Sequence, residues 1–416
     1  EITARRASAE MRIAVLDAEV EIEREQSRGD ADAAMLLQAY LSGWKMRRSA
    51  ALTEVQTLDL EEEGARDALT GAFEELKKFG CRRAAVAGPQ PARLPPLKTI
   101  TPGAFGTCVQ LANLTDPGWL DLARTHVSQL TPEWEMKMEY ILADGPDRLR
   151  LDRSDRIARF AADNGMALHG HTLIWYAQGQ DVFSGLDNAA FDRAFDGYIA
   201  TVAGRYRGKV RSWDVVNEPI LDDGSGLRDC HWSRRYGQDG YIRRAFDQAR
   251  IADPDAVLFL NEYNLEGVPA KGTQFLRLVE RLLKSGCPLQ GLGTQSHLWI
   301  DIPDGQIAAF MHELAQFGLP IHVSELDVSL RTDSPLDLRG LQERLSRQTA
   351  RVAELAAAYM RLPAAQRFGF TTWGLRDTDS WYRRGDKDDG KDRPLPFDAT
   401  GRPNPMAGAL AAAFQR

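Results

Sequence analysis

Short apolar runs alternate with longer amphipathic stretches from about residue 97 to the end of the chain, and this rhythm limits the possible folds more than any other feature. Alternating strands and helices are typical of a parallel sheet covered by helices. Eight such units predict an α/β fold, a (β/α)8 or TIM barrel, whose functional groups lie on the loops after the strands. The predicted strands are residues 104–109, 127–130, 166–170, 211–216, 256–260, 291–295, 320–324 and 368–373, and the predicted helices include residues 154–164, 191–206, 240–252, 273–284 and 338–361.

An open, doubly wound sheet is the alternative arrangement of the same units. Such a sheet normally carries a glycine-rich phosphate-binding turn after an early strand. The nearest match, residues 103–106 (GAFG), is poor. The barrel is therefore the preferred interpretation.

The first 87 residues have a different composition, rich in Ala, Glu, Arg, Leu and Met with apolar positions at helical spacing. They predict a small, mainly helical segment with breaks near residues 28–30 and before Asp59. A strand at residues 20–23 is the weaker alternative, because its neighbours are Ala and Glu. Residues 88–96 (GPQPARLPP) predict a proline-rich linker, so we place the barrel at residues 97–416.

Charge and composition exclude several classes of protein. The net charge of −7 is spread along the chain without a basic stripe, so we expect no nucleic-acid partner. No window reaches about 18 consecutive apolar residues, so we expect no membrane partner. The four cysteines lack C-x-x-C spacing. Because residue 1 is Glu rather than Met, we expect a trimmed or mature chain, and a secreted or periplasmic protein whose export signal lies outside this sequence.

Polar and aromatic residues follow seven of the eight predicted strands. Each has an ordinary explanation by itself, such as a loop cap, a core histidine or a packing tryptophan. Their joint occurrence favours a site, because the carboxyl ends of the barrel strands meet at one face. They are Glu133, Trp134 and Lys137 after the second strand, His169, His171 and Trp175 after the third, Asn217 and Glu218 after the fourth, Asn261, Glu262, Tyr263 and Asn264 after the fifth, Gln295 and His297 after the sixth, Glu325 and Asp327 after the seventh, and Trp373 after the eighth.

Two of these carboxylates, Glu218 and Glu325, come from strands on opposite sides of a barrel. Cleavage of an acetal needs a proton for the leaving oxygen and a second carboxylate to meet the positive charge that develops at the anomeric carbon. His297 is placed to hydrogen-bond Glu325 and keep it ionised, and Asp327 to orient the imidazole. The pair therefore suggests a glycosidase.

The neighbouring side chains suit a sugar ligand. The Asn217 amide can bind a hydroxyl group, and Trp175, Trp373 and Trp381 offer apolar faces on which sugar rings stack. Aromatic walls with few polar groups are typical of a carbohydrate cleft.

A metal site is a competing hypothesis, since residues 169–171 form an H-x-H motif. Metal-dependent barrel hydrolases usually carry this motif on the first strand and add His and Asp ligands from later strands. Here it follows the third strand, opposite mainly Glu and Trp. We therefore predict no metal and no cofactor. A Ser-His-Asp site is weaker still, because no G-x-S-x-G turn is present.

Seven ordered sequence blocks resemble those of family 10 glycoside hydrolases, the retaining xylanase family of clan A, and the resemblance extends from about Leu97 to Arg416. The blocks are LTPEWEMK (130–137), HGHTLIW (169–175), WDVVNEP (213–219), NEYN (261–264), GTQSHL (293–298), HVSELDV (322–328) and TTWGLRDTDSW (371–381).

The resemblance implies a retaining hydrolase of β-1,4-xylosidic bonds that acts on xylan or xylo-oligosaccharides. It implies that Glu218 is the acid/base, that Glu325 is the nucleophile, and that Asn217 binds the 2-hydroxyl of the sugar at the cleavage point. His297 and Asp327 would keep Glu325 charged. The remaining implied residues are Glu133, Lys137, His171, Trp175, Gln178, Gln295, Trp373 and Trp381 in the glycone subsites and Tyr263 facing the aglycone.

Three departures from the family pattern affect the expected substrate. Trp134 replaces the Asn of T-P-E-N, Tyr176 stands where W-H-S-Q has His, and Arg376 stands where a small Thr or Ser is common. They suggest altered chain-length preference, a decorated substrate or a non-xylan β-glycoside. The alternative is neutral drift, with Trp134 packed away from the cleft. A carbohydrate-binding protein without turnover is a further hypothesis, and the oligomeric state and the role of residues 1–90 stay open.

Overall fold

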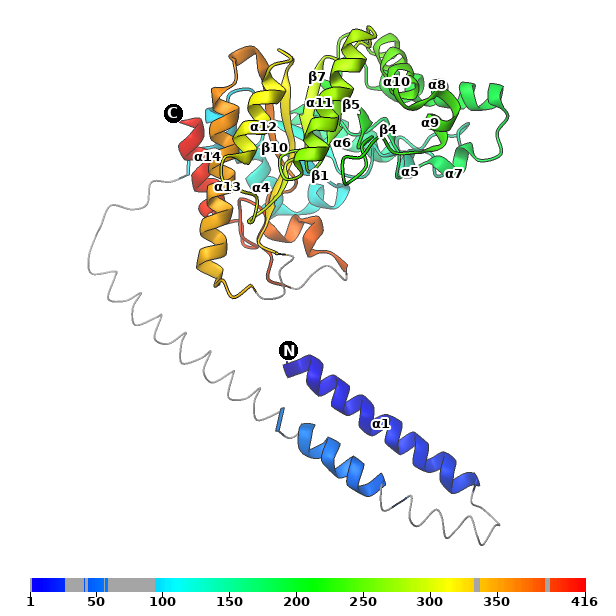
Figure 1. The fold of residues 1–416 in the computed structure, drawn as a ribbon, viewed down its shortest axis with the longest axis vertical. Helices are drawn as coiled ribbons and strands as arrows, with labels where there is room; N and C mark the ends of the chain where they lie inside the picture. Colours follow the sequence, from blue (N-terminus) through cyan, green and yellow to red (C-terminus); the bar gives the residue numbers. More distant parts are fainter. Residues whose placement is uncertain are drawn as a thin grey trace, which may run out of the picture. The chain divides into compact units, whose positions relative to one another are not determined.

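The structure is a computed structural model that describes residues 2–26, 41, 44–55, 57–58, 94–332, 337–385 and 390–416. The chain divides into two compact units, residues 1–93 and 94–416, which are described separately. Figure 1 shows the ribbon of both units.

The N-terminal unit contains α1 (Ile2–Gln26) and a second helical stretch, residues 44–55. Trp44 Nε1 donates to the Leu16 carbonyl (2.9 Å), and the Arg48 guanidinium pairs with both carboxylate oxygens of Asp17 (2.7 and 3.1 Å). The prediction of helices is confirmed in the described parts, and the alternative strand at residues 20–23 is wrong because α1 runs through it. The predicted break at residues 28–30 and the linker residues 88–93 lie outside the described residues.

Eight parallel strands close into a ring in the second unit, which confirms the predicted TIM barrel. β10 pairs with both β9 and β1, so the sheet has no free edge. Each strand feeds a crossover that returns to the start of the next strand, as the strand-helix alternation requires. The ring strands are β1 (Ala104–Val109), β2 (Gln129–Pro132), β3 (Ala167–Gly170), β5 (Ser212–Asn217), β6 (Val257–Glu262), β7 (Gly291–Thr294), β9 (Ile321–Ser329) and β10 (Arg367–Thr372).

Helices cover the outside of the ring (Figure 1). All five helices predicted in the barrel are present, with ends that shift by a few residues. The α-helices are α3 (Leu97–Ile100), α4 (Pro117–His126), α5 (Met138–Ile141), α6 (Asp152–Asp163), α7 (Gln180–Phe183), α8 (Asn188–Arg205), α9 (His231–Tyr236), α10 (Gln238–Ala252), α11 (Pro269–Lys284), α12 (Gln306–Ala315), α13 (Leu341–Arg361) and α14 (Pro405–Phe414), and short 3-10 turns are η1 (Leu111–Thr115), η2 (Ala364–Gln366), η3 (Asp377–Asp379) and η4 (Trp381–Arg383).

Most strand ends differ from the prediction by one or two residues, and the end of β9 differs by five. β2 begins at Gln129 rather than Val127, because Val127 ends α4 as its C-cap. β9 continues to Ser329, five residues beyond the predicted end, because the short strand β8 (His297–Trp299) pairs with its extension. A second short strand, β4 (Ile174–Trp175), pairs with the end of β5.

Polar side chains occupy part of the barrel interior, where branched apolar residues usually dominate. His322 Nε2 lies 2.8 Å from Thr371 Oγ1 and 3.4 Å from Gln129 Nε2. Arg211 Nη1 donates to Gln129 Oε1 (3.2 Å), and its guanidinium lies 3.9 Å from the centre of the Phe368 ring. A buried polar network therefore lies beneath the face that carries the site.

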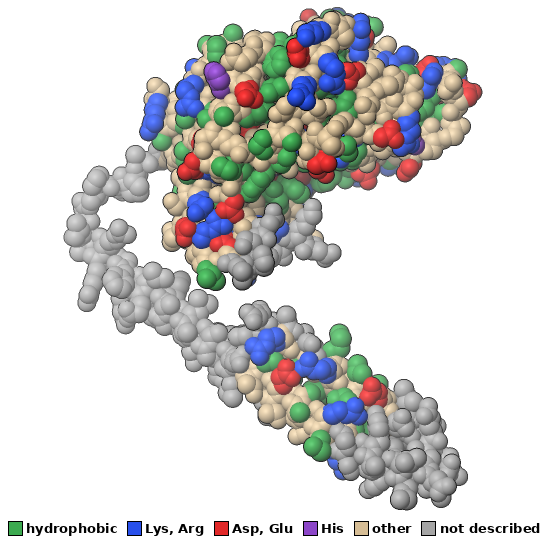
Figure 2. All heavy atoms as spheres, viewed as in Figure 1, with side chains coloured by type: hydrophobic (Ala, Val, Ile, Leu, Met, Phe, Trp, Pro, Cys, Tyr) green, Lys and Arg blue, Asp and Glu red, His purple; other side chains and the backbone are tan. Residues whose placement is uncertain are grey.

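The surface of the barrel unit carries both signs of charge side by side. On the face shown in Figure 2, Lys and Arg side chains are interspersed with Asp and Glu. Within the described ranges, none of the helices combines the length and apolarity that a membrane crossing demands. The described cysteines, Cys108, Cys230 and Cys287, are buried and form no disulfide.

Candidate active site

Glu218 stands directly after β5, at the face where the parallel strands end. Its φ of 57° lies in the left-handed region that non-glycine residues rarely adopt, and its backbone N–H donates to the Asn261 carbonyl (2.9 Å). Its carboxylate accepts hydrogen bonds from Trp175 Nε1 (2.8 Å), Asn217 Nδ2 (2.9 Å) and Gln295 Nε2 (3.0 Å). Side chains from β4, β5 and the end of β7 thus orient this carboxylate.

Glu325 lies within β9 and is only 4% exposed. Its Oε1 accepts a hydrogen bond from Asn261 Nδ2 (2.8 Å), and its Oε2 lies 3.4 Å from His297 Nε2. Burial raises the pKa of Glu325, but the charge of His171, the hydrogen bond and charge of His297, and Lys137 outweigh it and hold the pKa below its usual range. Glu325 is therefore an ionised carboxylate in a buried place.

His297 and Asp327 form an ion pair beside Glu325. His297 Nδ1 lies 2.9 Å from Asp327 Oδ1, and Trp381 Nε1 donates to Asp327 Oδ2 (2.9 Å). Burial lowers the pKa of His297, but the carboxylates of Asp327 and Glu325 raise it to about 10. The imidazole is therefore a cation at neutral pH, and the structure brings together the three residues that the sequence grouped.

Asn261 connects the two glutamates, a role that the sequence did not assign to it. Its Nδ2 donates to both Asn217 Oδ1 (2.9 Å) and Glu325 Oε1 (2.8 Å), and its Oδ1 accepts from Ser324 Oγ (2.7 Å). A Cβ at Gly293 would lie 2.3 Å from Asn261 Oδ1, so the amide needs a glycine beside it. Its position at the end of β6, in the block NEYN, was the available signal.

A cleft of about 340 Å³ opens over these groups, and both glutamates line it. Lys137 Nζ lies 4.9 Å from the Trp134 ring centre, 4.8 Å from that of Trp175 and 5.9 Å from that of Trp373. These distances allow cation–π attraction, which orients the ammonium among the indoles. The lining residues are Glu133, Trp134, Lys137, His171, Trp175, Glu218, Tyr263, Gln295, His297, Glu325, Trp373 and Trp381.

Glu133 is held by Arg384, a residue that the sequence did not single out. Arg384 Nη1 donates to Glu133 Oε1 (2.6 Å) and Nη2 to Oε2 (3.2 Å), while Gln110 Nε2 also donates to Oε2 (2.7 Å). Arg384 lies 251 positions later in the chain, and no motif indicated the contact. The carboxylate on this wall of the cleft is therefore paired with a cation.

Tyr263 lies on the cleft wall and contacts three charged side chains. Its hydroxyl donates to Asp222 and accepts from Arg228 Nη2 (2.8 Å), and Lys271 Nζ lies 3.2 Å from its ring centre. Lys271 also pairs with Glu262 (2.9 Å). Burial raises the pKa of Glu262 to about 7, against the lowering effect of Lys271.

Besides Asn217, which is buried beside Glu218, two predicted binding residues do not line the cleft. Gln178 Nε2 donates to Glu139 Oε2 (2.9 Å) at the surface, and Arg376 Nη2 pairs with Asp116 and Asp379 (2.7 Å each) between α4 and the loop after β10. Arg376 is thus occupied by a structural ion pair. Of the three departures from the family pattern, only Trp134 lines the cleft, so the alternative that it packs elsewhere is wrong.

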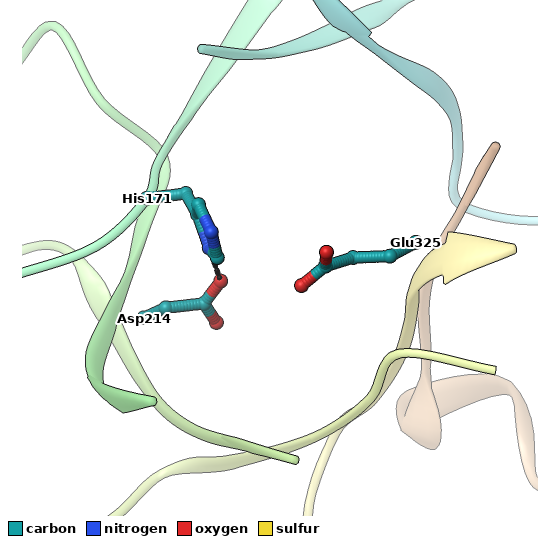
Figure 3. A group of neighbouring side chains, drawn as sticks. All are labelled: His171, Asp214 and Glu325. Carbon is teal, nitrogen blue, oxygen red and sulfur yellow. Dashed lines mark hydrogen bonds and ion pairs between the residues drawn. The ribbon is translucent and has the colours of Figure 1, made fainter. Parts of the chain in front are cut away.

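The two histidines of the H-x-H motif converge on one carboxylate. His169 Nε2 lies 2.9 Å and His171 Nδ1 2.8 Å from Asp214 Oδ2, and His169 Nδ1 lies 2.7 Å from Ser212 Oγ. One ligand atom each of His171, Asp214 and Glu325 lies within 4.8 Å of the others (Figure 3). The contact between His171 and Asp214 has the length of a hydrogen bond, so these two atoms hold a proton between them and do not both present lone pairs to a cation.

An eight-stranded parallel barrel with two glutamates and several indoles at the carboxyl ends of its strands is the architecture of a glycoside hydrolase. Comparison with known proteins identifies the family. The chain belongs to glycosyl hydrolase family 10, whose model matches residues 97–413. The family indicated by the seven sequence blocks is confirmed.

Curated relatives include endo-1,4-beta-xylanase A of Cellvibrio japonicus, which is 36% identical over 289 residues, covering 63% of this chain and 46% of that protein. Endo-1,4-beta-xylanase A of Thermotoga maritima is 34% identical, covering 73% of this chain and 29% of that protein. The chain thus spans less than half the length of these two relatives. A beta-1,4-xylanase of Dictyoglomus thermophilum is 32% identical, covering 74% of this chain and 88% of that protein.

Solved structures of xylanases are similar to this chain in fold. A thermostable mutant of a xylanase from Cellvibrio japonicus has a TM-score of 0.70 and 32% identity, covering 77% of this chain and 100% of the other. Another xylanase of that organism, solved in complex with xylopentaose, has a TM-score of 0.72 and 27% identity, covering 78% of this chain and 70% of the other.

Proposed function

We propose that the protein hydrolyses β-1,4-xylosidic bonds in xylan or xylo-oligosaccharides with retention of configuration. The observation that carries the proposal is the pairing of Glu218 and Glu325 across one indole-lined cleft, each fixed by its own set of hydrogen bonds. Relatives named xylanases, at 32–36% identity, support a xylosidic substrate.

The first step of the proposed reaction forms a glycosyl ester. Glu325 attacks the anomeric carbon, the bond from that carbon to the leaving oxygen breaks, and Glu218 gives its proton to that oxygen. Glu325 is suited to attack because its pKa is held low by cations. In the proposed scheme Asn217, whose Nδ2 donates to Glu218 Oε1 and whose Oδ1 accepts from Asn261 Nδ2, binds a hydroxyl group of the sugar.

The second step reverses the roles. Glu218, now a carboxylate, takes a proton from water while the water oxygen attacks the anomeric carbon, and the ester bond to Glu325 breaks. The product keeps the β configuration, and both glutamates return to their starting states.

A trapped sugar tests the nucleophile. A 2-deoxy-2-fluoro-β-xylobioside with a good leaving group slows both steps but lets the ester accumulate. We expect intact mass spectrometry to show addition of one 2-deoxy-2-fluoro-xylobiosyl group, and digestion to place it on the peptide containing Glu325. A label on another carboxylate would refute the assignment, and Glu325→Ala serves as the unlabelled control.

The products formed with azide distinguish the acid/base Glu218 from the nucleophile Glu325. In Glu218→Ala, a small anion can replace the missing base, so we expect a β-glycosyl azide from an aryl xylobioside. In Glu325→Ala, azide can replace the missing nucleophile and give the α product. With a poor leaving group, Glu218→Ala is expected to lose about 10² to 10⁴-fold in turnover. Identical azide products from the two variants would contradict this division of roles.

Trp134 favours a second candidate, the same chemistry on a short or non-xylan β-glycoside. Its ring lines the cleft and lies 4.9 Å from Lys137 Nζ, where the family pattern has a small hydrogen-bonding amide. If the ring closes the second glycone subsite, aryl xyloside or glucoside will match or exceed aryl xylobioside in kcat/KM, and Trp134→Asn will restore the preference for xylobioside. A strong wild-type preference for xylobioside would eliminate this candidate, whereas no turnover or labelling with any of the three would favour a binding protein.

A further inference from the structure

Glu262 is a buried carboxylate next to the turn that carries Glu218, and no step of the proposed reaction uses it. It ends β6, its side chain is fully buried, and it does not line the cleft. Its Oε2 accepts a hydrogen bond from the backbone N–H of Ile220 (2.9 Å), and its Oε1 accepts one from the backbone N–H of Tyr263 (3.0 Å). The carboxylate therefore connects the end of β6 to the loop that follows β5.

The backbone around Glu218 has few donors by which it can be held. Its φ of 57° is a conformation that costs a non-glycine residue on the order of 1 kcal/mol and persists only where neighbouring contacts hold it. The N–H of Glu218 donates to the Asn261 carbonyl (2.9 Å), Pro219 has no N–H, and the next donor is the Ile220 N–H that Glu262 accepts. Two consecutive residues of β6 thus hold both backbone N–H groups of this turn.

Lys271 provides the charge that balances the buried carboxylate. Its Nζ is fully buried and lies 2.9 Å from Glu262 Oε1 and 3.2 Å from the centre of the Tyr263 ring. Lys271 belongs to the first turn of α11, and a Cβ added at Gly224 would lie 2.4 Å from its backbone nitrogen, so the loop after β5 also packs on this helix. Because a buried charge without its partner is costly, the ion pair holds Glu262 against α11.

We propose that Glu262 is a positioning residue for the acid/base: through the Ile220 N–H it holds the turn after β5 at which Glu218 presents its carboxyl group to the leaving oxygen. The inference rests on the proposed role of Glu218. Glu262 does not contact the sugar in this scheme, and other side chains, Asn261 and His297, hold Glu325. Loss of Glu262 should therefore impair proton transfer by Glu218 and leave the attack of Glu325 in place.

Leaving groups of different acidity separate these two effects. Departure of 2,4-dinitrophenolate needs no proton, whereas departure of phenol needs one from Glu218. Because kcat/KM reports only the steps up to formation of the glycosyl ester, the ratio of kcat/KM for 2,4-dinitrophenyl and phenyl β-xylobioside measures the contribution of the acid. A general distortion of the cleft would lower both values alike.

Two variants remove the contact to different extents. Glu262→Gln keeps one acceptor oxygen in place of two, and Glu262→Met combined with Lys271→Met removes both oxygens without leaving a buried charge unpaired. We expect kcat/KM for the phenyl substrate to fall about tenfold in the first and about 10²-fold in the second, as for a small misplacement of a reacting group, and kcat/KM for the dinitrophenyl substrate to stay within about threefold of wild type. On the dinitrophenyl substrate kcat and KM should fall together, because Glu218 is also the base of the second step.

Glu266→Gln is the matched control. Glu266 is a buried carboxylate in the loop after β6, but its Oε1 accepts from Thr294 Oγ1 (2.6 Å) and Ser296 Oγ (2.5 Å) rather than from the loop after β5, so the ratio should keep its wild-type value. Labelling by 2,4-dinitrophenyl 2-deoxy-2-fluoro-β-xylobioside counts the correctly folded molecules in each preparation. If one Glu262 variant fails to fold, the other decides.

An unchanged ratio in the labelled molecules of either Glu262 variant overturns the inference, and so does an equal change of the ratio in Glu266→Gln. A wild type that neither hydrolyses these xylobiosides nor is labelled by the fluorinated one overturns the proposed function beneath it.

Discussion

Three amide side chains, Asn217, Asn261 and Gln295, hold the two glutamates in place. Asn217 and Gln295 donate to Glu218, and Asn261 donates to Glu325. An amide does not ionise between acid and alkaline pH, so these three side chains stay hydrogen-bond donors while carboxylates and imidazoles titrate. Their hydrogen bonds are strongest when the glutamates are charged, so they favour the ionised carboxylates as well as orienting them.

Gly293→Ala should disturb that geometry. The added Cβ would lie 2.3 Å from Asn261 Oδ1, so the amide must move away from Glu325. We expect a loss of about 10²-fold in kcat/KM, typical of a small misplacement of reacting groups, and about 1–3 kcal/mol of stability from overpacking. Gly197→Ala in α8, where an added Cβ meets no atom within 4 Å, is the matched control and should leave kcat/KM unchanged. Wild-type activity in Gly293→Ala would contradict the bridging role of Asn261.

Asp327→Asn should change how stability depends on pH. The pKa of His297 in the fold, about 10, lies above its ordinary value of 6.5. Its protonation therefore stabilises the fold fully below about pH 6.5, and that contribution is lost as pH rises through about 10. We expect the wild type to lose more stability than Asp327→Asn between neutral pH and pH 10, measured by denaturant unfolding of both proteins. Parallel loss in the two proteins would show that the pair contributes nothing.

Some residues of the site could be predicted from the sequence and others could not. Glu218 and Glu325 were identifiable because each lies within two residues of the end of a predicted strand and in one of the seven family blocks. Arg384 was not, since its contact with Glu133 joins segments 251 positions apart and depends on how the last loop folds over the mouth. Gln178 was misplaced because a position in a motif does not determine which way a loop side chain points.

At the scale of helices and strands, the alternation of apolar runs was sufficient to predict the barrel, because it follows from burial on both faces of a parallel sheet. Strand ends were less predictable. The extension of β9 depends on its pairing with β8, and that pairing brings His297 opposite Asp327 in register. The local pattern of apolar residues in β9 gives no information about its pairing with β8.

Arg376→Thr tests whether Arg376 serves the fold, by joining two elements through ion pairs, rather than binding substrate in the cleft. Arg376 joins η3 to Asp116, the N-cap of α4, and is 15% exposed. We expect kcat/KM within about twofold of wild type and a loss of about 1–2 kcal/mol in stability, reduced because Asp116 is partly exposed. Thermal unfolding and kinetics on the same preparation measure both. A tenfold change in kcat/KM would show that Arg376 contributes to substrate binding after all.

For the whole molecule, the barrel unit is expected to function without residues 1–93. Residues 94–416 contain all eight ring strands and every residue that lines the cleft. A compact unit with its own core folds alone, so the fragment 94–416 should unfold cooperatively and keep kcat/KM on an aryl xylobioside within about twofold of the full chain. A large loss of activity in a folded fragment would show that the N-terminal unit contributes to catalysis.

The closure of the ring by β10 on β1 also affects how the barrel can be connected. The first and last helices of the unit, α3 and α14, are in contact, and Tyr359 Oη donates to the Pro102 carbonyl (3.0 Å). Because the first and last elements of the closed ring are neighbours, the chain could begin at another point of the ring and still form the same strand pairs. A gene permuted to begin at the exposed turn around Gly208, with the old ends of the barrel unit joined by a short linker, would encode the same set of strand neighbours in a different linear order.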